Sequence, residues 1–186
     1  MKRTVSAIAA ALVLSGAQVV QAQQLVYTVV VPAGKFGSTN FLKELVRSVA
    51  TIKAFCGGVS DRSYRVDCMA DQLAAVSGEI PEGTDYDEVR NVLQDTSAKL
   101  EKLARDNRAV GKPRINVSAA TEGGVSASRP LTAVDEAKLD AVAAQAEAIL
   151  EEARTVLLRS AGSGQRRSQY ARIAQAIDSS KVLLRS

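Results

Sequence analysis

Cys56 and Cys68, the only two cysteines of the chain, are the residues whose type and spacing point most directly to chemistry. Gly57 and Gly58 follow the first cysteine and lie between two stretches of helical periodicity, which is typical of a turn between helices. Paired thiols of an exported protein normally oxidise, and closing a loop of this size stabilises a fold by about 3 kcal/mol in the chain-entropy model. We therefore predict a disulfide across a helix–turn–helix, with two free buried thiols as the alternative.

Most catalytic chemistry is excluded by composition, because the chain contains no histidine. A Ser–His–Asp or Cys–His site, a haem attachment motif and a histidine-based zinc site all need that residue. The spacing of the cysteines is not Cys-x-x-Cys, so a redox-active pair is not indicated. Gly34 and Lys35 suggest a phosphate-binding loop, but Phe36 stands where that motif needs Ser or Thr. We predict a protein that is not an enzyme and that holds no metal and no cofactor.

Two groups of carboxylates have ordinary structural interpretations. Asp85, Asp87 and Glu88 gather at the start of a predicted helix, where the helix dipole stabilises negative charge. Glu151 and Glu152 lie near the end of another helical pattern, and we interpret them as solvated surface. Neither group has the alternating oxygen ligands and the turn glycine of a calcium loop.

The turn between the cysteines offers the strongest candidate for an interaction surface. It presents Asp61, Arg62, Tyr64, Arg65 and Asp67 on a hairpin that the disulfide would hold rigid. Arg and Tyr are favoured at the energetic centres of protein interfaces. A turn between two helices must be polar in any case, so a purely structural role for these residues is the alternative.

The first residues have the pattern of a cleavable export signal. Lys2 and Arg3 form a short positive region, apolar residues follow over 5–20, and the stretch closes on Ala22 with small residues where signal peptidase reads. Polar residues interrupt the apolar run, which is short of the ~20 residues that span a bilayer, so a retained anchor is the weaker interpretation. We predict that residues 1–22 are a signal peptide, that the protein is periplasmic or secreted, and that no transmembrane segment remains after cleavage.

The charge of the mature chain argues against nucleic acid as a partner. The full sequence carries 24 Lys and Arg against 20 Asp and Glu, a net charge of +4. Loss of residues 1–22 removes two basic residues and no acidic one, which leaves +2 with both signs mixed along the chain. Proteins that bind nucleic acid carry strongly clustered positive charge instead.

Apolar residues spaced by three and four positions predict the helices of a single domain over residues 23–186. The first two predicted buried faces are Leu42, Leu45, Val49, Ile52 and Cys56, then Val66, Met69, Leu73, Val76 and Ile80. A third helix is predicted to reach Val110, a fourth to begin at Thr132, and a last one to cover about residues 166–184. Short turns favour an all-α fold, an antiparallel bundle of four to five helices with a short N-terminal extended segment. A coiled coil between two chains is the alternative.

Two stretches outside the helices are predicted to be extended. Residues 25–32 are rich in β-branched side chains and close on a proline, and residues 114–118 are the only other strand-like candidate, so the two could pair. Residues 112–130 are rich in Ser, Ala, Gly and Thr, which predicts a mobile crossover between the two long helices.

The functional hypothesis that fits these features is an exported envelope protein that binds or scaffolds another macromolecule without catalysis. Its partner would be another envelope protein or a second copy of the chain in a homodimer. The alternative is a carrier that holds a small apolar ligand between its helices.

Overall fold

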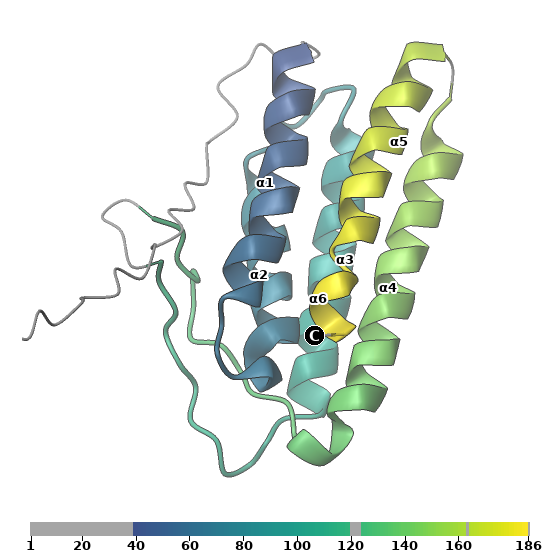
Figure 1. The fold of residues 1–186 in the computed structure, drawn as a ribbon. Helices are drawn as coiled ribbons and strands as arrows, with labels where there is room; N and C mark the ends of the chain where they lie inside the picture. The colour runs from purple at the N-terminus through teal and green to yellow at the C-terminus, as the bar shows by residue number, and fades with distance from the viewer. Residues whose placement is uncertain (1–38, 120–123, 163, 186) are drawn as a thin grey trace, which may run out of the picture.

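The computed structural model of the chain describes residues 39–119, 124–162 and 164–185. The predicted signal peptide (residues 1–22) and the predicted strand over residues 25–32 lie outside these ranges. The described residues fold into one bundle of helices with an irregular crossover on one side (Figure 1).

Five main helices alternate in direction and form a closed ring. They are α1 (Thr39–Gly57), α2 (Arg65–Gly78), α3 (Asp87–Asp106), α4 (Leu139–Ser160) and α5 (Gly164–Ser179), with the short turns η1 (Arg62–Tyr64), η2 (Glu136–Lys138) and α6 (Val182–Arg185). Each helix packs on the next, and α5 returns to lie beside α1, so these two neighbours run parallel (Figure 1). The prediction of an all-α antiparallel bundle is therefore confirmed. None of the described helices is long and apolar enough to cross a bilayer.

The helices form where the apolar residues repeat with the helical period. All five predicted core positions of α1, from Leu42 to Cys56, are buried, and so are the five predicted for the second helix, from Val66 to Ile80. These stripes are buried against each other and against α3, α4 and α5, because each stripe needs a neighbouring apolar face to leave water. The buried apolar residues form one core.

An aromatic cluster closes the end of the bundle that holds the start of α3. The rings of Phe41 and Tyr86 lie with centroids 5.0 Å apart, and those of Tyr86 and Tyr170 lie 6.5 Å apart. The Tyr170 hydroxyl donates to the carbonyl oxygen of Asp85 at 2.8 Å, and the Tyr86 hydroxyl donates to the Gln169 side chain at 3.2 Å. Burial raises the pKa of both tyrosines, so both stay protonated donors that tie α3 to α5.

The structure corrects two predicted helix ends around the crossover. The third helix ends at Asp106, and Val110, predicted to continue its buried face, is 90% exposed. The fourth helix begins at Leu139, after η2, and Thr132 is buried in the crossover instead of starting a helix. The reason is that the backbone beyond Asp106 finds partners across the crossover in place of the next helical turn. The predicted last helix is also divided, into α5 and α6.

The crossover folds back on itself as a ribbon, which we call the strap. Its outer arm is residues 107–119 and its inner arm is residues 124–135, joined by antiparallel bridges that pair Arg108 with Val134, Ile115 with Leu131 and Ser118 with Ser126. Residues 114–118 thus pair with the inner arm. The composition of residues 112–130 predicted a mobile crossover, whereas the described residues of this range are hydrogen-bonded to each other and to α2. Figure 1 shows the strap along one side of α1 and α2.

Candidate functional site

The hairpin between α1 and α2 positions the predicted site residues. Cys56 in the last turn of α1 and Cys68 in the first turn of α2 lie at disulfide-bonding distance, with their Cα atoms 5.7 Å apart, and both are fully buried. Gly58 turns the chain, and its N–H donates to the carbonyl oxygens of Ala54 and Phe55 at the end of α1. The turn η1 then leads into α2, so the polar residues between the cysteines are fixed on a short, tightly bonded hairpin.

Asp61 connects this hairpin to the outer arm of the strap. Its carboxylate accepts a hydrogen bond from the Ser63 N–H at 2.9 Å, which caps η1, and one from the Lys112 ammonium at 2.8 Å. The hydrogen bond from Lys112 lowers the pKa of Asp61 to about 2. Lys112 also pairs with Glu136 at 2.7 Å, and its own pKa is raised because Asp61 and Glu136 accept hydrogen bonds from its ammonium group.

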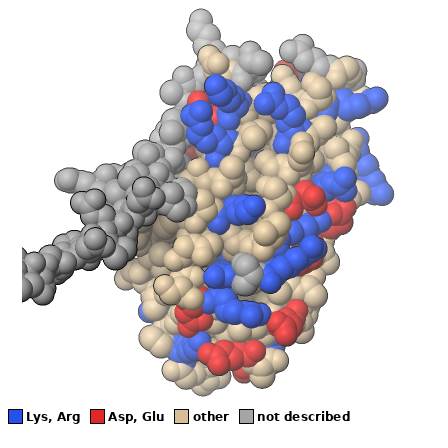
Figure 2. Space-filling view, in the orientation of Figure 1, with Lys and Arg blue, Asp and Glu red and all other residues tan. Residues whose placement is uncertain are grey.

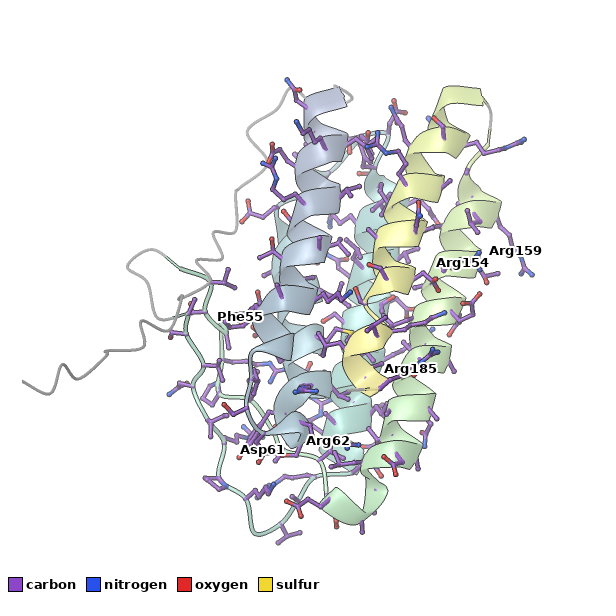
Figure 3. All side chains as sticks on the ribbon, viewed as in Figure 1. Phe55, Asp61, Arg62, Arg154, Arg159 and Arg185 are labelled. Carbon is purple, nitrogen blue, oxygen red and sulfur yellow. A yellow bond between two sulfur atoms is a disulfide. The ribbon has the colours of Figure 1, made fainter. Side chains whose placement is uncertain are left out.

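The side chains of Tyr64, Arg62 and Arg65 point to different surroundings. Tyr64 is buried, and its hydroxyl donates to the carbonyl oxygen of Pro113 on the outer arm at 2.7 Å. Arg62 is exposed and pairs with Asp140 of α4 at 2.9 Å, on the side of the hairpin that faces α4 (Figure 3). Arg62 and the half-buried Arg65 line a hollow of about 20 Å³ that α6 closes.

Asp67 is fully buried and holds the inner arm of the strap. Its two carboxylate oxygens each accept a hydrogen bond from the Arg129 guanidinium at 2.8 Å, and one also accepts from the Thr132 N–H at 2.6 Å. This planar two-point pairing is the strongest geometry available to Arg and a carboxylate. Asp67 raises the pKa of Arg129, so the guanidinium stays charged.

Asp71, one turn further along α2, completes this anchor. Its carboxylate accepts hydrogen bonds from the Ser128 N–H at 2.9 Å, from the Ser128 hydroxyl, and from the Gln72 amide at 3.0 Å. The Gln72 amide donates in addition to the carbonyl oxygen of Ser126 at 3.0 Å. We call Asp67, Asp71, Arg129 and Ser128 the strap lock. Side chains of α2 thus satisfy backbone groups of the inner arm that a neighbouring strand would otherwise bond.

A cleft of about 510 Å³ separates the hairpin from the outer arm. Its walls are residues 58–61 and Tyr64 on the hairpin side and residues 115–118 on the strap side. We call it the hairpin–strap cleft. Asp61 and Tyr64, two of the five residues predicted as an interaction patch, line it. Arg62 and Arg65 lie beside α4 and α6, and Asp67 lies in the strap lock, so the hairpin does not present these five side chains on one surface.

The outer arm turns an open backbone edge towards this cleft. Ile115 exchanges both of its backbone hydrogen bonds with Leu131, and the Val117 carbonyl oxygen and the Ala119 N–H bond the inner arm as well. Strand geometry therefore directs the N–H and C=O groups of Asn116 and Ser118 away from the inner arm. Within the described residues these groups have no hydrogen-bond partner, and both side chains are exposed.

Sequence reasoning did not single out Arg129, Asn116 and Ser118 as candidate site residues. The only local signal was the strand-like alternation of residues 114–118, which indicated an extended segment but not which edge would be open. Among the described residues, no three His, Cys, Asp or Glu side chains converge as metal ligands. The arrangement supplies hydrogen-bond donors and acceptors and a shaped cleft, the chemistry of binding. Comparison of the chain with protein-family models, with curated proteins and with solved structures finds no match.

Proposed function

We propose that this protein is an exported, non-catalytic binding module that holds an extended polypeptide segment of an envelope partner in the hairpin–strap cleft. The observation that carries the proposal is the open edge at Asn116 and Ser118, which borders that cleft. A row of unpaired N–H and C=O groups can form hydrogen bonds with an added strand, as it does in proteins where a peptide extends the edge of a sheet.

The chemistry of the edge supports an added strand. Proteins usually protect exposed edges with charged residues or proline, and residues 115–119, Ile-Asn-Val-Ser-Ala, contain neither. Ile115 and Val117 are half-buried against the core, so the packing of their side chains holds this part of the backbone in place. A partner segment with small or β-branched side chains would match this uncharged surface.

The surrounding contacts supply the rigidity that such binding needs. The strap lock fastens the inner arm to α2, and the hydrogen bond from Tyr64 to Pro113 and the pairing of Asp61 with Lys112 fasten the outer arm to the hairpin. An edge that is already ordered loses little conformational entropy when a peptide binds. The contacts found for three residues of the predicted patch thus support a binding role for the cleft beside them.

Two further features support export and binding without catalysis. Residues 1–22 have the pattern of a signal peptide, and a cysteine pair at bonding distance is typical of exported proteins. The absence of histidine from the sequence removes the commonest general base.

The alternative of a small-ligand carrier receives less support from the described residues. The hollow beside α6 has a volume of about 20 Å³, which suits a single water molecule. A shallow groove of about 220 Å³ between α3 and α4 is bridged at its rim by Lys99, which pairs with Asp95 and Glu152. The core positions facing the middle of the bundle are filled by packed aliphatic side chains.

To test the proposal, nine-residue peptides that bind the mature protein are selected from a random library. The best binder is then synthesised with N-methyl groups at one or the other set of alternate residues. Methylation of the amides that face Asn116 and Ser118 should weaken binding at least about tenfold, because two backbone hydrogen bonds of about 1 kcal/mol each are lost. Methylation of the other set is the matched control and should change affinity little. Amide hydrogen exchange should show protection of Asn116 and Ser118 in the complex.

Equal losses from the two methylated sets, or protection that falls outside the cleft, would contradict strand addition. Failure to select any extended peptide would contradict the proposed function altogether.

A further inference from the structure

Charge is segregated between the two sides of the bundle. Helices α1 and α5 and residues 181–185 carry eight basic and two acidic residues, a net of +6. Residues 65–106, which include α2 and α3, carry five basic and ten acidic residues, a net of −5. The basic residues on the first side are Lys43, Arg47, Lys53, Arg166, Arg167, Arg172, Lys181 and Arg185. We call this side the basic face.

The basic face is one continuous surface. Helices α1 and α5 are parallel neighbours, and α2 and α3 lie behind them in Figure 1. Figure 2, in the same orientation, shows blue side chains spread over this face, with few red ones towards the end of the bundle where α1 and α5 begin. Arg159 of α4 lies at the border of this face, where Arg154 is paired with Glu151 (Figure 3).

Part of this charge has no internal counter-charge. Four of the eight basic side chains pair with carboxylates: Arg47 with Glu44, Arg166 with Asp85, Lys181 with Glu151 and Asp178, and Arg185 with Glu147. Lys43, Lys53 and Arg172, in contrast, make no ion pair with any carboxylate of the described residues. Lys43 and Arg172 are exposed, and Lys53 is half-buried. These three side chains therefore leave net positive potential on the face.

We propose that the basic face adsorbs on a layer of anionic phospholipid headgroups. The positive side chains are spread along α1, which is about 28 Å long, and do not converge in a pocket that would select a single phosphate. Spread positive charge matches a spread negative surface, to which each nearby basic side chain contributes about a factor of five in binding.

The composition of the face favours lipid over an acidic protein as the partner. Protein interfaces centre on buried aromatic and arginine side chains that fill pockets, whereas the large apolar side chains exposed among the described residues are Val110, Leu158 and Val182, all aliphatic. Adsorption is therefore electrostatic, and salt reverses it. The proposal is independent of the hairpin–strap cleft, which lies beside the strap.

The experiment measures cosedimentation of the full mature chain with vesicles of phosphatidylcholine alone or with one third phosphatidylglycerol. The test variant carries Lys43→Gln, Lys53→Gln and Arg172→Gln. The control variant carries Lys102→Gln, Arg105→Gln and Arg108→Gln, which remove the same charge from α3 and the start of the strap. Circular dichroism of both variants verifies that helix content is unchanged.

The unmodified protein should bind the anionic vesicles at low salt and not those of phosphatidylcholine alone. The test variant should bind roughly a hundredfold more weakly, since three contributions of about fivefold are lost, and the control variant should bind nearly as well as the unmodified chain. Equal losses in the two variants, equal binding to both vesicles, or no binding at low salt would overturn the proposal. Tighter binding to immobilised polyglutamate than to the anionic vesicles would also overturn it, in favour of an acidic polypeptide.

Discussion

Cys68 and Asp67 are neighbours at the start of α2, and they fasten two different parts of the chain. Both side chains are fully buried. Cys68 lies against Cys56, only 12 residues earlier, whereas Asp67 binds Arg129, 62 residues later. Successive positions on a helix point about 100° apart, so one turn of α2 can hold α1 on one side and the strap on another.

The two fastenings depend on different physics. The disulfide acts mainly by restricting the unfolded chain, so its contribution follows from loop length. The Asp67 carboxylate is stable in the interior only because Arg129 and the Thr132 N–H satisfy it, and removing one partner leaves the others unpaired. We therefore expect loss of the lock to act on the folded strap and loss of the disulfide to act on the unfolded state.

The largest effect is expected from Asp67→Ala. The change removes the acceptor of the Thr132 N–H and leaves the Arg129 guanidinium only the longer contacts with Asp71 at 4.0 Å and Glu101 at 3.8 Å. It should lower the free energy of unfolding by about 3 to 5 kcal/mol. Urea denaturation measures the loss. Asp95→Ala, at an exposed acid of α3, is the matched control and should change stability by less than about 0.5 kcal/mol. Comparable losses in the two variants would remove the distinction between the lock and an ordinary surface pair.

The double variant Cys56→Ala/Cys68→Ala should lose about 3 kcal/mol, the amount expected for a loop of this size. Because the effect lies in the unfolded state, the strap should open locally no more often than in the unmodified protein. The amides of Ser128 and Thr132 should therefore still exchange only through global unfolding to the same extent as in the unmodified protein. In Asp67→Ala these same amides should exchange faster by local opening. If the cysteine variant opened the strap locally, the two fastenings would not be independent.

Ser128→Ala removes one hydroxyl donor to Asp71 and leaves the backbone N–H bond in place. Hydrogen bonds to charged groups contribute more than neutral ones, so we expect a loss of about 1.5 kcal/mol in urea denaturation. Ser179→Ala, which removes a hydroxyl on the exposed end of α5, should be close to neutral. A neutral Ser128→Ala would show that the Ser128 hydroxyl adds nothing to the backbone bond that Asp71 accepts.

The smallest effect is expected from Asp61→Asn, and it should depend on pH. The folded-state pKa of Asp61, about 2, lies below its ordinary value. The pair with Lys112 therefore contributes stability above about pH 4, and this contribution is lost as the pH falls towards 2. Unfolding midpoints measured from neutral pH down to pH 2 should show a slightly less stable variant at neutral pH and no difference near pH 2. A difference that persisted at pH 2 would assign the effect to the cap on η1.

The helices and the cysteine pair could be predicted from residue type and spacing alone. The period of the apolar residues is local, so it located the buried faces of α1 and α2, and the glycines after Cys56 marked the turn that brings the cysteines together. The end of α3 and the start of α4 were predicted wrongly, at Val110 and Thr132, because the helical pattern continues there. The end of α3 and the start of α4 are set instead by backbone hydrogen bonds within the strap.

The roles of Asp67, Tyr64 and the strap depend on contacts between distant parts of the chain. A buried carboxylate and a buried hydroxyl are stable only beside partners, and those partners, Arg129 and Pro113, lie 62 and 49 residues away. No local pattern links residues at such separations. The composition of residues 112–130 indicated mobility, because small polar residues bury little apolar surface. The strap is held by hydrogen bonds to charged and polar groups of α2, which composition does not reveal.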